Sequence, residues 1–338
     1  PHHDITVFES AESIGGHTAT KTINFREKTY NIDTGFIVYN DWTYPNFIKL
    51  MDEIGVQNKT TEMSFSVSCQ NSGLEYGGNN LNSLFAQRKN LFKPRYLKMI
   101  LDIIRFNKEA VIDLDEGAIS PSSTLREYLT ENNYSEGFIN HHLVPMGCAI
   151  WSASTNVMLD FPLLFFVRFF KNHGLLSINN RPQWRVIQGG SSRYLKPLSQ
   201  SFSEKIRTSS DIQSVERRSG QVLLHMGSGS VEIFDQVILA CHSDQALALL
   251  KDPNKSEKDI LEAIPYNNNE VVLHTDASLL PKNRLTWSSW NYLLDNNSNN
   301  PPALTYNMNI LQGIDSDSTF CVTLNATDKI APDKILGT

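Results

Sequence analysis

The stretch Ile5-Thr-Val-Phe-Glu9, followed by Gly15-Gly-His17, decides how this chain of 338 residues is interpreted. Residues 4–9 are apolar and β-branched and end in a carboxylate, which is typical of a short buried strand. In dinucleotide-binding folds the second strand ends in Glu or Asp, and its carboxylate accepts hydrogen bonds from ribose hydroxyls. Paired glycines let backbone N–H groups approach a pyrophosphate where a Cβ would collide. The spacing therefore predicts that Glu9, Gly15 and Gly16 hold the adenosine half of a dinucleotide.

The glycine-rich turn that normally precedes such an acid is not in this sequence. A Gly-x-Gly-x-x-Gly turn is expected about 20 residues before the acid, whereas eight residues precede Glu9. Either the turn has been truncated away or the chain has another fold, since a strand-end Glu near two glycines also arises by chance. The chain opens on Pro1 almost directly before a strand, and we therefore expect a fragment.

Composition restricts the class of protein. The chain is 40% apolar and 10% aromatic with a formal net charge of −6, which predicts sizeable cores and, without a basic stripe, no nucleic-acid partner. The four cysteines form no CxxC pair, and reduced thiols in a cytoplasmic protein are the expectation.

Neither a metal site nor a membrane span is predicted. The neighbours His141 and His142 would point about 100° apart on a helix, and no third ligand lies at a suitable spacing. No apolar run is long enough to span a membrane, which leaves a peripheral membrane contact open.

The remaining pattern runs from strand-rich to helical and back to strand-rich. Periodicity predicts a helix over 46–54, mainly helices over 82–175 with a capped start near 122–127, and a short helix over 244–250. Strands are predicted within 21–39, 62–76, 185–187, 206–209, 212–217, 222–226, 231–241, 270–275, 285–294, 303–311 and 319–325. Within 231–241, residues 236–240 read as a buried strand whose carboxyl end would face a ligand crevice.

This order predicts an α/β protein whose two domains are each assembled from separated stretches of chain. We assign residues 1–45 and 186–250 to an incomplete Rossmann-like domain. Residues 46–185 and 251–338 form a second domain of mixed or antiparallel sheet and helices, with 82–175 mainly helical. Serines such as Ser152 lack a Gly-x-Ser-x-Gly setting, so a hydrolase triad is not predicted.

Several motifs together resemble the flavin superfamily that includes monoamine oxidases, phytoene desaturases and protoporphyrinogen oxidases, close to a bacterial branch described as predicted NAD/FAD-binding proteins. The resemblance runs through most of the chain. Its motifs are Gly15-Gly-His-Thr18, Asp33-Thr-Gly-Phe36, Ile150-Trp-Ser152, Asn172-His-Gly-Leu175, Trp184 with Gly189-Gly190, Ala240-Cys-His242 and Trp287 to Tyr292.

The resemblance implies FAD as the cofactor, held by residues that can be named position by position. His17 would replace an Arg that many superfamily members have after the glycine pair. The implied residues are Glu9 for the ribose; Gly15, Gly16 and His17 for the pyrophosphate; Asp33, Gly35 and Phe36 for the flavin end; Val215, through its backbone, for the adenine; and Ala240 and His242 closing the crevice. The C-terminal segment that covers the flavin ring in relatives is also absent from this sequence.

Aromatic residues are the predicted lining of a substrate cavity, although aromatic side chains on one sheet face also pack against helices in many proteins. Likewise, the apolar stretch Phe161–Phe170, with Phe92 and residues 99–104, could form either a channel or core. The predicted lining residues are Trp151, Trp287, Trp290, Tyr292, His274 and Tyr306.

No acid–base residue stands out as catalytic, which agrees with flavin chemistry. The resemblance implies an oxidoreductase that oxidises a C–N or C–C bond by hydride transfer to FAD, and the apolar helices favour a hydrophobic small-molecule substrate. A flavin-dependent desaturase or isomerase acting on a lipid-like substrate is one alternative. A non-catalytic scaffold that binds other proteins is the other.

Overall fold

The computed structural model describes residues 3–294 and 303–338. Contacts divide the chain into two compact units, each built from two stretches: unit 1 is Pro1–His17 with Tyr194–Asn268, and unit 2 is Thr18–Arg193 with Asn269–Thr338. Both units are discontinuous in sequence. Their boundaries differ from the predicted domains, because residues 18–45 and 186–193 pack within unit 2 and residues 251–268 within unit 1.

Unit 2 is built on a seven-stranded sheet in the order β17-β13-β16-β15-β14-β6-β7. The β14–β6 pair is parallel and the other pairs are antiparallel. The strands are β6 (Phe65–Cys69), β7 (Leu74–Gly77), β13 (Val271–His274), β14 (Trp290–Leu294), β15 (Ala303–Asn307), β16 (Cys321–Leu324) and β17 (Ile335–Gly337). The mixed, largely antiparallel sheet predicted for this part of the chain is confirmed.

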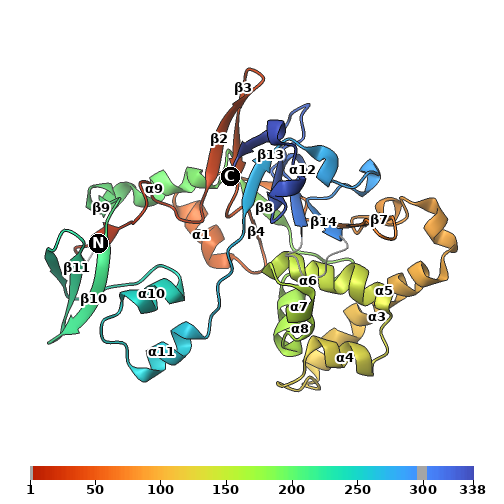
Figure 1. The fold of residues 1–338 in the computed structure, drawn as a ribbon, viewed down its shortest axis with the longest axis horizontal. Helices are drawn as coiled ribbons and strands as arrows, with labels where there is room; N and C mark the ends of the chain where they lie inside the picture. The colour runs from red at the N-terminus through yellow and green to blue at the C-terminus, as the bar shows by residue number, and fades with distance from the viewer. Residues whose placement is uncertain (1–2, 295–302) are drawn as a thin grey trace. The chain divides into compact units, whose positions relative to one another are not determined.

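Two smaller sheets complete the strands of unit 2. The hairpin β2 (Thr20–Phe25) and β3 (Lys28–Asp33) projects from the unit in Figure 1 and turns at Arg26 and Glu27, which both have positive φ. Positive φ at both central residues matches the right-handed twist of the flanking strands. The other sheet has the order β4-β8-β5, with β4 (Val38–Asn40), β5 (Asn58–Thr61) and β8 (Trp184–Ile187).

Helices α3 to α8 gather into one cluster of unit 2, which confirms the helical stretch predicted over 82–175 (Figure 1). Thr124 accepts from Glu127 N while the Glu127 side chain accepts from Thr124 N, the predicted capped start. The helices of unit 2 are α1 (Pro45–Glu53), α2 (Leu81–Leu84), α3 (Pro94–Asp115), α4 (Leu125–Glu131), α5 (Glu136–Phe138), a π-helical stretch Ile139–Leu143, α6 (Val144–Trp151), α7 (Thr155–Leu159), α8 (Leu163–Asn172) and α12 (Met308–Leu311).

The main core of unit 2 lies between this helical cluster and one face of the large sheet. Phe106, Phe138 and Phe166 are fully buried there, together with Val67 and Leu304 from the sheet. The Phe161–Phe170 stretch therefore packs largely as core rather than as a channel. Its most exposed ring, Phe165, contacts Trp151 at a centroid distance of 6.2 Å.

Unit 1 combines a short parallel strand pair, a three-stranded meander and three α-helices. Strand β1 (Val7–Phe8) pairs in parallel with β9 (Ile206–Arg207) in a two-stranded sheet. The other elements are α9 (Leu195–Ser199), β10 (Ile212–Arg218), β11 (Gln221–Met226), β12 (Val231–Phe234), α10 (Ser243–Leu249) and α11 (Lys255–Glu262).

Two strand predictions in unit 1 need correction. The strand predicted over 4–9 is paired only at Val7 and Phe8, and Ile5 remains 42% exposed. The buried strand predicted over 236–240 is not paired at all, and Ile238 is 92% exposed. Both segments are apolar enough for a two-sided buried position, but a strand forms only where a neighbour supplies its backbone hydrogen bonds.

Candidate functional site

Glu9 lies where the strand pair β1–β9 ends, at the carboxyl end of both strands. Its backbone N donates to Arg207 O at 2.9 Å, and Ser210 N donates to Glu9 O at 2.9 Å. The carboxylate oxygen Oε1 accepts from Ala11 N at 2.9 Å. Among the described residues no hydrogen bond reaches Oε2, so this oxygen could accept from a ligand hydroxyl at a strand end where dinucleotide folds bind ribose.

The glycine pair forms the open bend that follows Glu9. Gly15 has φ 122° and Gly16 has φ 52°, both in the region that favours glycine. A Cβ on Gly16 would meet no atom within 4 Å, so the backbone there faces open space. Beyond the bend, the His17 ring stacks on that of His242 with centroids 5.3 Å apart and planes 12° apart.

The stack continues from His242 to a residue that sequence reasoning did not single out. The rings of His242 and Tyr266 lie 4.3 Å apart with planes 7° apart, and Tyr266 Oη accepts from Ser243 N at 2.9 Å. The structure thus brings together His17 and His242, and it leaves Ala240 exposed next to them. Tyr266 stands in a loop without a local motif, so no sequence signal would have found it.

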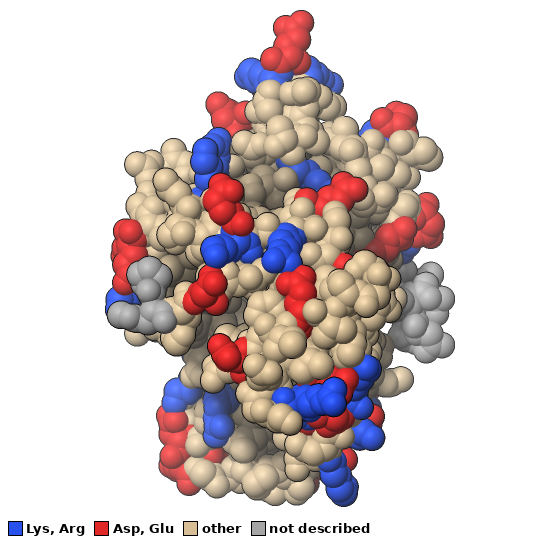
Figure 2. Space-filling model, turned by 90° about the vertical axis from the view of Figure 1, so that its left-hand side faces the viewer, with Lys and Arg blue, Asp and Glu red and all other residues tan. Residues whose placement is uncertain are grey.

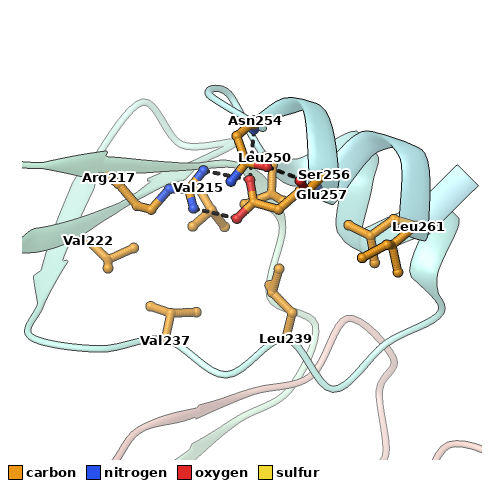
Figure 3. A pocket seen from close by; sticks show the side chains of 11 residues that line it. Val215, Arg217, Val222, Val237, Leu239, Leu250, Asn254, Ser256, Glu257 and Leu261 are labelled. Carbon is orange, nitrogen blue, oxygen red and sulfur yellow. Dashed lines mark hydrogen bonds and ion pairs between the residues drawn. The ribbon is translucent and has the colours of Figure 1, made fainter.

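A cavity of about 390 Å³ lies in unit 1 between the β10–β11 hairpin and helix α11 (Figure 3). This volume falls in the range of small-molecule sites. Of the predicted cofactor residues only Val215 lines it, and the Val215 carbonyl accepts from Lys251 N at 3.0 Å. The lining consists of Val215, Arg217, Val222, Val237, Leu239, Leu250, Asn254, Ser256, Glu257, Ile260 and Leu261.

An ion-pair network forms the polar rim of this mainly apolar cavity. Arg217 donates to both carboxylate oxygens of Glu257, at 2.6 and 2.9 Å, and to Asp252 Oδ2 at 3.2 Å. The hydrogen bonds from Arg217 lower the pKa of Glu257 to about 2. Because Arg217 is held by these two carboxylates, the network ties β10 to the start of α11 (Figure 3).

In unit 2, Asp33 is the centre of a buried hydrogen-bond network. Its carboxylate is fully buried and accepts from Thr20 Oγ1 at 2.6 Å, from Ser191 N at 2.9 Å and Ser191 Oγ at 3.0 Å, and from Gln312 Nε2 at 2.8 Å. Asp33 N in turn donates to Gln312 Oε1 at 2.8 Å. Burial raises the pKa of Asp33, and the hydrogen bonds from Thr20 and Ser191 oppose this shift.

The Asp33 network joins the end of β3 to the loop after β8 and to the end of α12. Gly190 in that loop has φ 101°, and a Cβ there would lie 2.5 Å from Thr20 Cγ2, so the close packing requires glycine. Beyond Asp33, Gly35 is exposed and Phe36 contacts the Phe47 ring at 5.3 Å. The Asp33 side chain is therefore occupied by protein groups, which connect it to the two neighbouring loops.

The predicted aromatic lining is partly brought together on the large sheet. Trp290 faces Tyr306 across β14 and β15, with centroids 5.1 Å apart and planes 88° apart. Tyr292 lies on the same face but is buried in the core, as a sheet face packed on helices would place it. Trp290 Nε1 is buried and has no hydrogen-bond partner in the described parts of the chain, so it is a donor that a ligand could satisfy.

Three other predicted lining residues lie elsewhere. His274 is fully buried, and the register of β13 with β16 puts it on the opposite sheet face from Tyr306, hydrogen-bonded to Thr323 Oγ1 at 2.7 Å. Trp287 precedes β14 and donates to Pro281 O at 2.8 Å. Trp151 packs among the phenylalanines of α8. His274, Trp287 and Trp151 therefore do not line a common surface with the Trp290–Tyr306 pair.

Charged side chains of both signs are interspersed over the face that Figure 2 presents, so this face offers no patch of one sign. Among residues 3–294 and 303–338, no cluster of three His, Cys, Asp or Glu side chains could hold a metal ion. In the same part of the chain, no helix combines the length and apolarity needed to cross a bilayer.

Two buried histidines predict how stability depends on pH. Burial lowers the pKa values of His142 and His274 to about 4, from an ordinary value of 6.5. Between these values the unfolded chain binds protons that the folded chain does not, so the free energy of unfolding falls as pH falls from about 6.5 toward 4. At pH 5 we expect a loss of about 2 kcal/mol per histidine relative to pH 7.

Urea unfolding at pH 7 and pH 5 checks this expectation. His274→Gln keeps a donor for Thr323 and an acceptor for Asp276 N, which donates to the His274 ring at 3.0 Å, but it does not titrate. The variant should lose less stability than the unmodified protein on going to pH 5. An equal loss in both proteins would show that His274 does not carry this pH dependence.

Comparison with known proteins identifies a family to which this chain belongs and solved structures with a similar fold. A family model described as flavin containing amine oxidoreductase matches residues 1–308, whereas a search of curated protein sequences finds no match. Among solved structures, cyclohexylamine oxidase from Brevibacterium oxydans IH-35A is 14% identical with a TM-score of 0.62, covering 98% of this chain and 73% of that one.

Two further structures show the range of relatives. A CLA-producing fatty acid isomerase from P. acnes is 13% identical with a TM-score of 0.61, covering 97% of this chain and 71% of that one. Putrescine oxidase bound to putrescine is 13% identical with a TM-score of 0.58, covering 97% and 72%. At these identities the likeness shows the fold.

The mixed sheets and helices define an α/β fold similar to that of cyclohexylamine oxidase. The chain belongs to the family of flavin-containing amine oxidoreductases, because the family model matches most of its length. It is therefore an FAD-dependent oxidoreductase, and the predicted superfamily, fold class and cofactor are confirmed.

Proposed function

We propose that this protein oxidises a C–N or C–C bond of a hydrophobic small molecule, with the substrate's hydride passing to FAD. FAD, when bound, supplies the electron acceptor, and the chain's own residues supply binding and orientation. In unit 1, Glu9 Oε2 is available to ribose hydroxyls, and the open backbone at Gly16 can approach a phosphate. These observations support the assignment of the adenosine diphosphate half to this strand end.

The observation that carries the substrate class is the buried donor Trp290 Nε1, which has no partner among the described residues and lies on a sheet face that otherwise packs as the core of unit 2. On the face that bears Trp290 and Tyr306, the register places apolar or aromatic side chains throughout β6, β14, β15 and β16. They are Phe65, Val67, Cys69, Trp290, Tyr292, Leu294, Leu304, Tyr306, Val322 and Leu324. A second charged group, at the far end of a substrate, would find no carboxylate on these strand positions, and an unpaired charge in such surroundings is costly.

Tyr306 and Trp290 supply the polar groups that could orient a substrate on this apolar face. Burial raises the pKa of Tyr306, so its hydroxyl stays protonated and acts as a neutral hydrogen-bonding group at physiological pH. Trp290 Nε1 is the unpaired donor. We propose that Trp290 binds one polar atom of an otherwise apolar substrate.

Substrate competition tests the proposal directly. In the full-length protein we expect apolar substrates, such as a long-chain alkylamine or an unsaturated fatty acid, to reduce the flavin without oxygen. A diamine of equal chain length should react with a kcat/KM at least about tenfold lower, because its second charge must be desolvated. Anaerobic bleaching of the flavin absorbance measures both.

The outcome also separates the alternatives. A product with a moved double bond and no net flavin reduction would favour the isomerase, as the fatty acid isomerase fold would allow. Faster reduction by the diamine would overturn the apolar substrate. Trp290→Phe keeps the ring but removes the donor, and it should raise KM for substrates with a polar head group while leaving FAD binding unchanged.

A further inference from the structure

A strongly basic segment stands out in this acidic chain. Residues 88–108 contain seven Lys or Arg residues and one acidic residue, whereas residues 109–116 contain four acidic residues and no Lys or Arg. The basic charge is therefore confined to the part of the segment before Glu109. The segment covers the 3₁₀ turn Arg88–Phe92 and most of α3, all within unit 2.

The single acid of this segment does not neutralise its outer surface. Asp102 is buried, accepts from Ser135 N at 3.0 Å, and lies 3.4 Å from Lys98 Nζ and 3.3 Å from Arg105. By contrast, four basic residues of the segment are exposed and form no ion pair within residues 3–294 and 303–338. They are Lys89, Lys93, Arg95 and Lys108.

Helix α3 is also apolar on the side that faces solvent. Leu97 is 38% exposed, Leu101 63%, Ile104 48% and Ile112 41%. Their spacing of four, three and eight residues puts them on one stripe of the helix. The buried face, which carries Met99 and Phe106 among others, lies on the opposite side. A helix that needed only to pack on its core would present polar residues on its outer side.

The apolar stripe extends past the beginning of the helix. Leu91 is 44% exposed and Phe92 is 86% exposed, next to Lys89 and Lys93. An aromatic ring exposed between two lysines is costly in water, but it suits the boundary between lipid head groups and acyl chains.

We propose that this α3 surface, consisting of Leu91, Phe92, Leu97, Leu101 and Ile104 with Lys89, Lys93 and Lys108, docks on an anionic lipid membrane. The lysines attract acidic head groups, and the apolar side chains enter the head-group region. The helix would lie in the plane of the membrane, because its apolar stripe runs along one side of the helix. This inference goes beyond the proposed reaction and does not depend on it.

Vesicle co-sedimentation tests the proposal. The protein should bind phosphatidylglycerol–phosphatidylcholine vesicles and bind phosphatidylcholine vesicles far more weakly, and raising the ionic strength to about 0.5 M should weaken binding. The triple variant Phe92→Ser/Leu101→Ser/Ile104→Ser should partition about tenfold or more weakly into acidic vesicles. Replacing Lys89, Lys93 and Lys108 by Ser should reduce the preference for acidic lipid.

A control variant replaces three exposed apolar residues elsewhere in the chain. Ile178, Val231 and Leu285 are 61%, 45% and 51% exposed, and changing all three to Ser should leave vesicle binding unchanged. Circular dichroism confirms that each variant is folded. As an independent measurement, Phe92→Trp should add a fluorescence component that shifts to the blue with acidic vesicles.

Three results would overturn the inference. They are no binding to acidic vesicles, equal binding by the Phe92/Leu101/Ile104 triple variant, or an unshifted spectrum for Phe92→Trp in bound protein. If light scattering instead shows self-association that this triple variant abolishes, the α3 surface is an interface with a second copy.

Discussion

Asp33→Ala should unfold unit 2 at a markedly lower temperature or urea concentration than the unmodified protein. The substitution removes the acceptor of four hydrogen bonds, from Thr20 Oγ1, Ser191 N, Ser191 Oγ and Gln312 Nε2, at a fully buried position. A buried donor left without a partner costs about 1–3 kcal/mol, so we expect a loss of roughly 4 kcal/mol or more. Thermal and urea unfolding measure it.

The control is a double variant in which the carboxylate and the amide of residues 33 and 312 are exchanged. Asp33→Asn keeps an acceptor for Thr20 and Ser191 but turns an amide donor toward the Gln312 donor, so we expect an intermediate loss. Adding Gln312→Glu supplies a carboxylate that can accept from both the new amide and the backbone N of residue 33. The double variant should therefore be more stable than Asp33→Asn alone. Equal stability of Asp33→Ala and the unmodified protein would refute the network's importance.

Glu9→Ala should weaken FAD binding by about 10-fold to 100-fold, because one charge-assisted acceptor contributes roughly 1.5–3 kcal/mol. Fluorescence titration of the full-length apoprotein with FAD gives the dissociation constant. The carboxylate makes only local, exposed contacts to Ser10 and Ala11, so thermal stability without FAD should stay nearly unchanged. A parallel loss of stability would indicate a structural role instead.

Glu12 offers a matched control in the same loop. It is exposed, lies three residues after Glu9 and belongs to the same turn-rich stretch. Glu12→Ala removes the same charge from the neighbourhood without removing the strand-end carboxylate. If both substitutions weaken FAD binding equally, a general electrostatic effect explains the result and Glu9 has no specific contact with the ribose.

The sequence was most informative where the signal is local. The capping pair Thr124 and Glu127, the periodicity of α1 and α3 and the β6–β7 hairpin all depend on residues close in the chain, and the structure confirms them. The strand predicted over 236–240 failed because its residues have the right character but no neighbouring strand. Strand propensity depends on context in this way.

The candidate sites show the same difference between features set by neighbouring residues and features set by residues distant in sequence. The bend at Gly15 and Gly16 could be predicted, because positive φ has a residue-type signature. The partners of Asp33 could not, since Ser191 and Gln312 lie far away in sequence and nothing near them marks their role. Face assignments on the large sheet likewise required the strand register, which separates His274 from Tyr306.

The pairing of β1 with β9 also has a consequence for biosynthesis. Val7 must find Ile206, which the ribosome adds about 200 residues later, or about 10–40 s later at 5–20 residues per second. During that interval β1 has no native partner. The first stretch of unit 2, Thr18–Arg193, is complete before Ile206 is added, so unit 2 can begin to fold while β1 is still unpaired. Mutations or synthesis conditions that lengthen the delay should therefore raise the demand for chaperones before they affect the finished enzyme.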